Sequence, residues 1–157
     1  MKPFFLFVSL CLMTPNCLSQ ENTSSIQPYF SAIIVSDIEN SIDWYSKRFN
    51  FTVISRTNLE ERGFKQANLK IDSFLLELIE IEGTFDAKKA IEENTEYKFV
   101  QGFFKIGFQV NDLNFWIEHL KNEKTDFFGD VVSDPNSGKK MLIIKDPDGN
   151  YIQLFEK

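Results

Sequence analysis

This 157-residue chain has one histidine and two cysteines, so imidazole and thiol groups for catalysis or metal binding are scarce. The only histidine, His119, falls in the middle of an expected helix, where a surface or boundary position is typical. Both cysteines, Cys11 and Cys17, lie in an N-terminal segment that we expect to be removed. The sequence therefore argues against catalysis through a Ser–His or Cys–His pair. Glu77, which stands in an apolar run, is the only candidate for a general base.

The first residues have the pattern of a secretory signal peptide. Lys2 precedes an apolar run that ends at Met13, and the small residues Cys17 and Ser19 precede a polar stretch. The run is too short to span a bilayer, so no membrane span is expected. We expect an exported protein, periplasmic or secreted, in which residues 1–19 are the signal peptide and 20–27 a flexible segment. The alternative is a lipid anchor on Cys17.

The charge balance restricts the partners. Cleavage removes Lys2 from the 17 basic residues, which leaves 16 basic against 23 acidic side chains and a net charge of −7. Such an acidic surface argues against nucleic acid and anionic membranes. It is compatible with a neutral or cationic small molecule. Without cysteine, the mature chain would also have no disulfide framework.

The chain contains two copies of one unit. The segment Val35-Ser36-Asp37-Ile38 returns 75 residues later as Val110-Asn111-Asp112-Leu113. The segment Leu76-Glu77-Leu78 returns 76 residues later as Ile152-Gln153-Leu154. Similarity at both ends of the unit indicates two related modules.

The sequence pattern of each module predicts secondary-structure elements in the order β-α-β-β-β. In the first, a strand from Tyr29 to Val35 precedes a helix that Asp37 caps and that ends near Arg48, before Asn50. Strands are expected near 51–56, 64–72 and 74–81. In the second, we expect a strand over 103–110, a helix after Asp112 to about 123, and strands near 127–133, 139–145 and 150–155. Residues 83–101 form a polar linker with a helical tendency over 86–93.

Alternation along the strands assigns one face of the sheet to a cleft. The residues expected to line this ligand-binding cleft are Phe30, Ala32, Ile34, Leu75, Glu77, Lys105, Gln109, Tyr151, Gln153 and Phe155. A mostly apolar surface with a few polar groups is typical of a small-molecule pocket. The same composition also suits a second core or a contact between two subunits.

Two motifs resemble those of the vicinal oxygen chelate superfamily, which contains glyoxalases, bleomycin resistance proteins and extradiol dioxygenases. The segment from Val35 to Tyr45 is similar to the opening helix motif of the family, and Asp146 to Leu154 is similar to its closing turn and strand. The resemblance implies an α+β fold over residues 28–157, in which paired βαβββ modules form a cleft sheet with helices on its outer face. The module boundaries would be about 28–82 and 102–157, with the linker at 83–101. A second subunit often completes the cleft in this family, so the resemblance also implies a homodimer as one arrangement.

By the same resemblance, enzymes of the family hold a divalent metal with four side chains, one from the first and one from the last strand of each module. The corresponding positions here are Phe30, Glu77, Lys105 and Gln153. Phenylalanine has no donor atom, and a protonated lysine repels a cation. The sequence therefore predicts neither a metal nor another cofactor in the cleft.

The expected function is the binding of a small apolar or cationic molecule in a metal-free cleft, similar to the drug-sequestering branch of the family. Two enzyme alternatives stay open. One is a metal-dependent lyase, isomerase or dioxygenase with an altered ligand set, and the other is a metal-free enzyme that uses Glu77 as its base. We also expect Lys105 to replace the metal and to pair with Glu77, with support from Gln109 and Gln153, because a buried carboxylate needs a partner.

The signal-peptide pattern predicts that the mature protein begins near Gln20 and contains no cysteine. Intact-mass measurement of the protein from its natural host tests this directly. A retained Met1, or a lipid on Cys17, would contradict simple cleavage.

Overall fold

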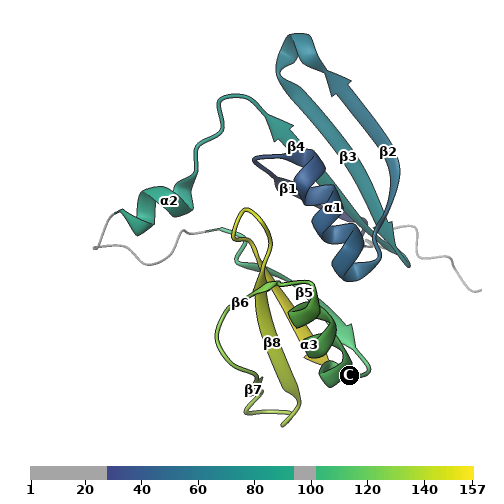
Figure 1. The fold of residues 1–157 in the computed structure, drawn as a ribbon, viewed down its shortest axis with the longest axis vertical. Helices are drawn as coiled ribbons and strands as arrows, with labels where there is room; N and C mark the ends of the chain where they lie inside the picture. The colour runs from purple at the N-terminus through teal and green to yellow at the C-terminus, as the bar shows by residue number, and fades with distance from the viewer. Residues whose placement is uncertain (1–27, 94–101) are drawn as a thin grey trace, which may run out of the picture.

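The computed structural model describes residues 28–93 and 102–157, so the expected signal peptide (1–19) and N-terminal segment (20–27) lie outside the described residues. Two βαβββ units follow one another along the chain (Figure 1). The first contains β1 (Phe30–Ile34), α1 (Ile38–Phe49), β2 (Thr52–Leu59), the 3₁₀ turn η1 (Glu60–Arg62), β3 (Phe64–Ile71) and β4 (Phe74–Ile81). Its strand order is β1-β4-β3-β2, with β1 parallel to β4 and the other pairs antiparallel.

The second unit repeats this plan with one difference. It contains β5 (Lys105–Val110), α3 (Leu113–Asn122), β6 (Asp126–Phe127), β7 (Val132–Ser133), β8 (Lys140–Lys145) and β9 (Tyr151–Glu156). The order is β5-β9-β8-β6, and β7 also pairs with β8. The single strand expected near 127–133 is therefore split in two. Gly129 between the two parts has φ = 80°, a left-handed conformation that interrupts a strand.

The connection between the units contains a short helix, α2 (Ala87–Glu92), within the range where the sequence predicted helical tendency. Asp86 begins it, and its carboxylate accepts a hydrogen bond from the backbone N–H of Lys89 at 2.9 Å. No helix of the described residues is long and apolar enough to cross a membrane.

The helix ends follow the predicted capping chemistry. Asp37 accepts a hydrogen bond from the backbone N–H of Asn40 at 2.9 Å, and Asp112 accepts one from Phe115 at the same distance. Asn50 ends α1 in the left-handed conformation, at φ = 58°. The repeated Asp at the start of each helix is thus the local reason why the two units begin alike.

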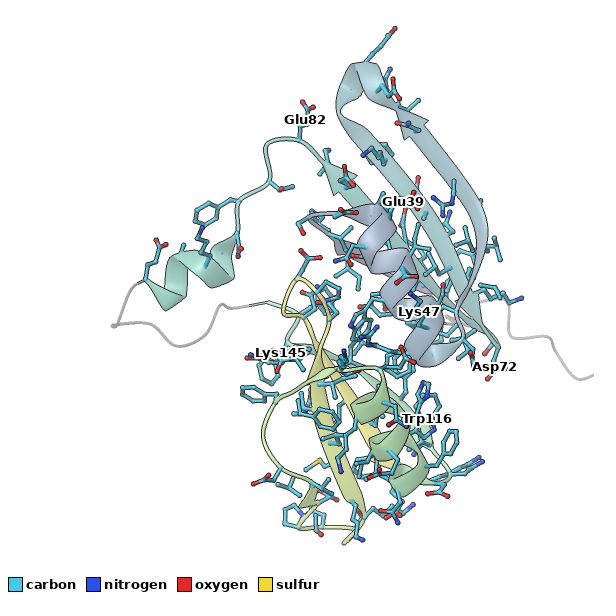
Figure 2. The ribbon with its side chains drawn as sticks, viewed as in Figure 1. Glu39, Lys47, Asp72, Glu82, Trp116 and Lys145 are labelled. Atoms are coloured by element: carbon cyan, nitrogen blue, oxygen red, sulfur yellow. The ribbon has the colours of Figure 1, made fainter. Side chains whose placement is uncertain are left out.

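The two units share one hydrophobic core, to which both sheets and both long helices contribute. The ring of Phe49 at the end of α1 lies 5.7 Å from that of Phe108 on β5 and 5.6 Å from that of Trp116 on α3. Figure 2 shows side chains from both units filling the region between α1 and α3. Burying one such aromatic side chain contributes roughly 1.5–3 kcal/mol, so the units stabilise each other.

A buried hydrogen bond joins α1 to the closing turn of the second unit. The hydroxyl of Tyr45, which is 1% exposed, donates to Oδ2 of Asp146 at 2.9 Å. Burial and the nearby Asp146 carboxylate raise the pKa of Tyr45 well above its usual value, so its hydroxyl remains a donor at neutral pH.

The Asp146 carboxylate is also held by its own turn. Its Oδ1 accepts the backbone N–H groups of Asp148 and Asn150, and its Oδ2 accepts the Asn150 side-chain amide. Burial raises the pKa of Asp146, whereas the hydrogen bonds from Asn150 and Tyr45 act in the opposite direction. This network fixes the closing turn against the helix of the other unit.

A second polar junction lies at the far end of α1. Arg48 donates from Nε to the Thr125 hydroxyl at 2.8 Å and from Nη2 to the Glu123 carbonyl at 2.5 Å. Nε2 of His119 lies 3.0 Å from the Arg48 carbonyl oxygen. His119 is half-buried at this boundary between the units, which agrees with the position expected from the sequence.

We predict that Tyr45→Phe lowers the free energy of unfolding by about 1–3 kcal/mol, because the buried Asp146 carboxylate loses the hydrogen bond that joins it to the other unit. Denaturant unfolding measures this. Tyr29→Phe is the matched control, since Tyr29 is 72% exposed and its substitution should change stability by less than about 0.5 kcal/mol. Equal stability of the Tyr45→Phe variant and the wild type would show that the hydrogen bond does not join the units.

Candidate functional site

The first sheet presents five of the expected cleft residues on one face. They are Phe30, Ala32, Ile34, Leu75 and Glu77, and all are exposed or partly exposed. Residues that alternate with them on β4, such as Leu76 and Leu78, are buried in the core. The register places Glu77 between Ala32 on β1 and Asn68 on β3.

The second sheet presents the other five, which are Lys105, Gln109, Tyr151, Gln153 and Phe155. Cross-strand neighbours share a face, so the register of β5, β9 and β8 defines rows of side chains on it. The rows are Lys105–Tyr151–Lys145, Gly107–Gln153–Ile143 and Gln109–Phe155–Met141. The first row therefore has a tyrosine between two lysines.

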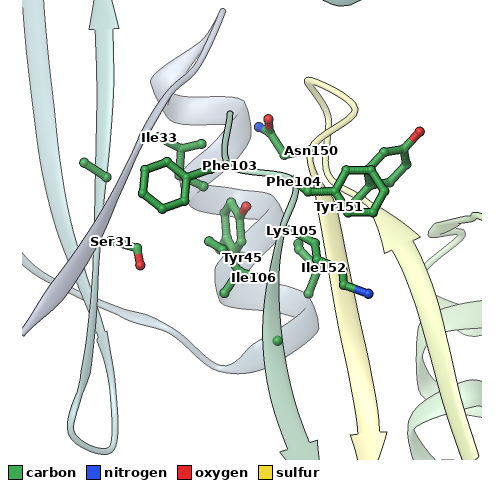
Figure 3. A pocket seen from close by; sticks show the side chains of 12 residues that line it. Ser31, Ile33, Tyr45, Phe103, Phe104, Lys105, Ile106, Asn150, Tyr151 and Ile152 are labelled. Carbon is green, nitrogen blue, oxygen red and sulfur yellow. The ribbon is translucent and has the colours of Figure 1, made fainter. Parts of the chain in front are cut away.

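A cavity of about 390 Å³ opens between β1 and β5, the edge strands of the two sheets (Figure 3). Tyr45 lies between the two strands, with Ile33 on the β1 side and Phe104 and Tyr151 on the other. The described residues that line it are Ser31, Ala32, Ile33, Tyr45, Phe103, Phe104, Lys105, Ile106, Gly107, Asn150, Tyr151 and Ile152. As edge strands, β1 and β5 have an outer side whose backbone groups take no part in the strand ladders.

This cavity overlaps the expected cleft only in part. Ala32, Lys105 and Tyr151 line it. The remaining seven expected residues lie on the sheet faces outside it, and they are Phe30, Ile34, Leu75, Glu77, Gln109, Gln153 and Phe155. Strand alternation predicts the face on which a side chain lies, but it does not predict which sheet edges lie opposite each other. For this reason the sequence did not indicate that Tyr45, Ile106 and Asn150 line the cavity.

Phe103 and Phe104 were expected inside a strand, but β5 begins at Lys105. The partner strand β9 begins opposite it at Tyr151, directly after the closing turn, so the two phenylalanines have no strand beside them. Their side chains line the cavity instead. One sequence signal could have indicated that these two residues lie outside the strand. They are adjacent aromatic residues, and the partner of the strand that follows them begins directly after a tight turn.

Aromatic rings and two lysines pack together beside the cavity, and Phe104, Tyr151 and Lys105 of this group line it. Tyr151 packs against Phe104, with ring centres 5.2 Å apart, and against Phe128, with centres 4.7 Å apart. The ammonium of Lys105 lies 5.8 Å from the centre of the Phe104 ring, and that of Lys145 lies 5.6 Å from the Phe128 ring. Both distances permit a cation–π contact.

The expected ion pair between Glu77 and Lys105 is wrong. Among the described residues, no ion pair joins them. Glu77 instead accepts a hydrogen bond from the side-chain amide of Gln66, a diagonal neighbour on β3. Lys105 is exposed and needs no buried partner, and a neutral amide on the adjacent strand already satisfies the carboxylate.

The positions that hold a metal in related enzymes do not fit one in this chain. Phe30 offers no donor atom, and Lys105 places an ammonium where a ligand would stand. The Gln153 amide contacts the sulfur of Met141. Within residues 28–93 and 102–157, no group of three or more His, Cys, Asp or Glu side chains is arranged to hold a metal.

Comparison with known proteins places this fold in a family. Residues 26–154 match the profile of the Glyoxalase/Bleomycin resistance protein/Dioxygenase superfamily. The chain belongs to this superfamily. The "Uncharacterized protein YwkD" of Bacillus subtilis is 31% identical over 127 residues, which cover 80% of this chain and 93% of that relative.

Solved structures share the same architecture. A glyoxalase family protein from Enterococcus faecalis has a TM-score of 0.71 and 22% identity, over 83% of this chain and 97% of the other. The trypanothione-dependent glyoxalase I of Leishmania major has a TM-score of 0.61 and 23% identity, over 84% and 87%. At these identities the likeness establishes the fold, and the expected α+β class of paired βαβββ modules is confirmed.

Proposed function

We propose that this chain is a small-molecule-binding member of the superfamily that acts without a metal. The observation that supports this most strongly is the cavity of about 390 Å³ between β1 and β5. Its walls are mostly aromatic and aliphatic, with a few polar groups from Ser31, Lys105 and Asn150. Its size and composition are those of pockets that hold drug-sized molecules.

The chemistry of the side chains favours binding over catalysis. Metal-dependent lyase, isomerase or oxygenase activity would need donors that Phe30 and Lys105 lack. The metal-free alternative needs Glu77 as a base, but Glu77 lies outside the cavity and is engaged by Gln66. Neither enzyme alternative has a matching group of side chains among the described residues.

Export and pairing of two copies belong to the same proposal. The N-terminal sequence pattern supports export, to the periplasm or the exterior. Pairing is supported by exposed apolar side chains on the cleft face, where Phe30 is 54% and Ile34 57% exposed. An exposed apolar patch of this kind is typical of a contact surface.

We predict that purified protein retains far less than one divalent ion per chain after dialysis, because only Glu77 among the four family positions is a good ligand. Elemental analysis measures this. The matched control is the triple substitution Phe30→His, Lys105→His and Gln153→Glu, which restores the ligand types of the family and should gain metal. Stoichiometric zinc, nickel, iron or manganese in the wild-type protein would contradict the metal-free proposal.

A further inference from the structure

We propose that the cavity between β1 and β5 selects ligands that carry an anionic group on a flat apolar body, such as aromatic carboxylates, with Lys105 as the anchor of the anion. This inference rests on the proposed small-molecule binding function and adds the ligand class to it. It differs from the neutral or cationic ligand with which the net charge of the whole chain is compatible. The local charges around the cavity are the reason.

The cavity itself is basic although the chain is acidic. Among its described lining residues, Lys105 is the only one with a charged side chain, and none is acidic. Lys105 forms no ion pair within the described residues, so its ammonium is available to a ligand. Interactions between charges weaken strongly beyond about 8–10 Å in physiological salt, so the groups nearest the ligand decide its charge preference.

The acidic residues near the cavity are already engaged. Asp146 lies behind Tyr45, and its two oxygens accept four hydrogen bonds. Asp148 accepts the backbone N–H of Ser36 at 3.1 Å. Asp86 and Asp148 line a neighbouring cavity of about 480 Å³, which shares Phe103 and Asn150 with this one. None of the three carboxylates lines the cavity between β1 and β5 itself.

A second lysine, Lys145, lies in the same cross-strand row as Lys105. It lies directly across β9 from Lys105, with Tyr151 between them. Its ammonium is 3.8 Å from the Asp126 carboxylate, at the limit of an ion pair, and that carboxylate is 67% exposed. An exposed pair of this length is weak, so Lys145 still contributes to attracting an anion.

The apolar part of the ligand is specified by the aromatic wall. Phe104 and Tyr151 present ring surfaces, and Ile33, Ile106 and Ile152 supply aliphatic surface. A flat aromatic body can pack against these rings. The outer edges of β1 and β5 add backbone N–H groups that can donate to a carboxylate.

Three compounds that share the naphthalene ring and have an anionic, a neutral or a cationic head group test the proposal: 2-naphthoate, 2-naphthylmethanol and 2-naphthylmethylammonium. We expect 2-naphthoate to bind the purified protein most tightly in calorimetry, with an affinity that falls as salt is raised. Lys105→Met should lower the affinity for 2-naphthoate about 10-fold or more and leave the affinity for the alcohol unchanged. Lys105→Arg should retain most of the affinity, and Lys145→Met should have a smaller effect than Lys105→Met.

Lys140→Met is the matched control, because Lys140 is exposed at the opposite end of β8 from Lys145 and lies outside the cavity. Thermal unfolding checks the fold of each variant, and Lys105→Gln is the second variant at the anchor position. If the alcohol or the ammonium compound binds as well as 2-naphthoate, and Lys105→Met changes nothing, the anionic preference is wrong while small-molecule binding stands. If none of the three binds, the ligand class and the proposed function both fail.

Discussion

The position of the candidate site depends on the buried hydrogen bond between Tyr45 and Asp146. Tyr45 belongs to the helix of the first unit, and Asp146 begins the closing turn of the second. The carboxylate in turn holds the backbone of that turn, from which β9 starts. Together with the aromatic packing around Phe49, this contact fixes the two sheets so that β1 and β5 lie on either side of one cavity. Because Tyr45 also lines the cavity, the same side chain holds the units together and shapes the site.

This arrangement gives the chain a pocket that does not depend on side chains of metal-ligand type at the four family positions. The four metal positions lie along the strands, and their side chains here are apolar, basic or engaged with neighbours. The cavity is formed where the edges of the two sheets meet, and Lys105 is the only one of the four positions that lines it. Its other walls come from β1, β5 and β9, with the closing turn, α1 and the residues before β5. The side chains of Phe30 and Lys105, which do not fit a metal, are therefore compatible with a cavity between the sheets.

Local features of the fold could be predicted from the sequence, whereas contacts between the units could not. Asp37, Asp112 and Asn50 act within a few residues of their own position, so their capping roles follow from residue type alone. Alternation also assigned the correct strand face to Glu77, because the side-chain period of a strand is fixed.

The wrong expectations concern the environment of a side chain. The sequence suggested that Glu77 needs Lys105, but Gln66 on the adjacent strand satisfies it first. The expected strand near 127–133 is divided because Gly129 adopts a left-handed conformation, which the residue type permits without requiring it. These features depend on which residues lie close together in the fold although they are distant in the sequence. Neither the composition nor the hydrophobic periodicity of the sequence indicates this.

The most direct test of metal-free small-molecule binding at this site is a titration of backbone amide NMR signals with 2-naphthoate in the presence of a chelator. Binding between β1 and β5 predicts the largest shift changes at 31–33, 105–107 and 150–152. If no signals shift under these conditions, or if the largest changes occur on the exposed face of α3 around Phe115, metal-free binding between β1 and β5 is contradicted.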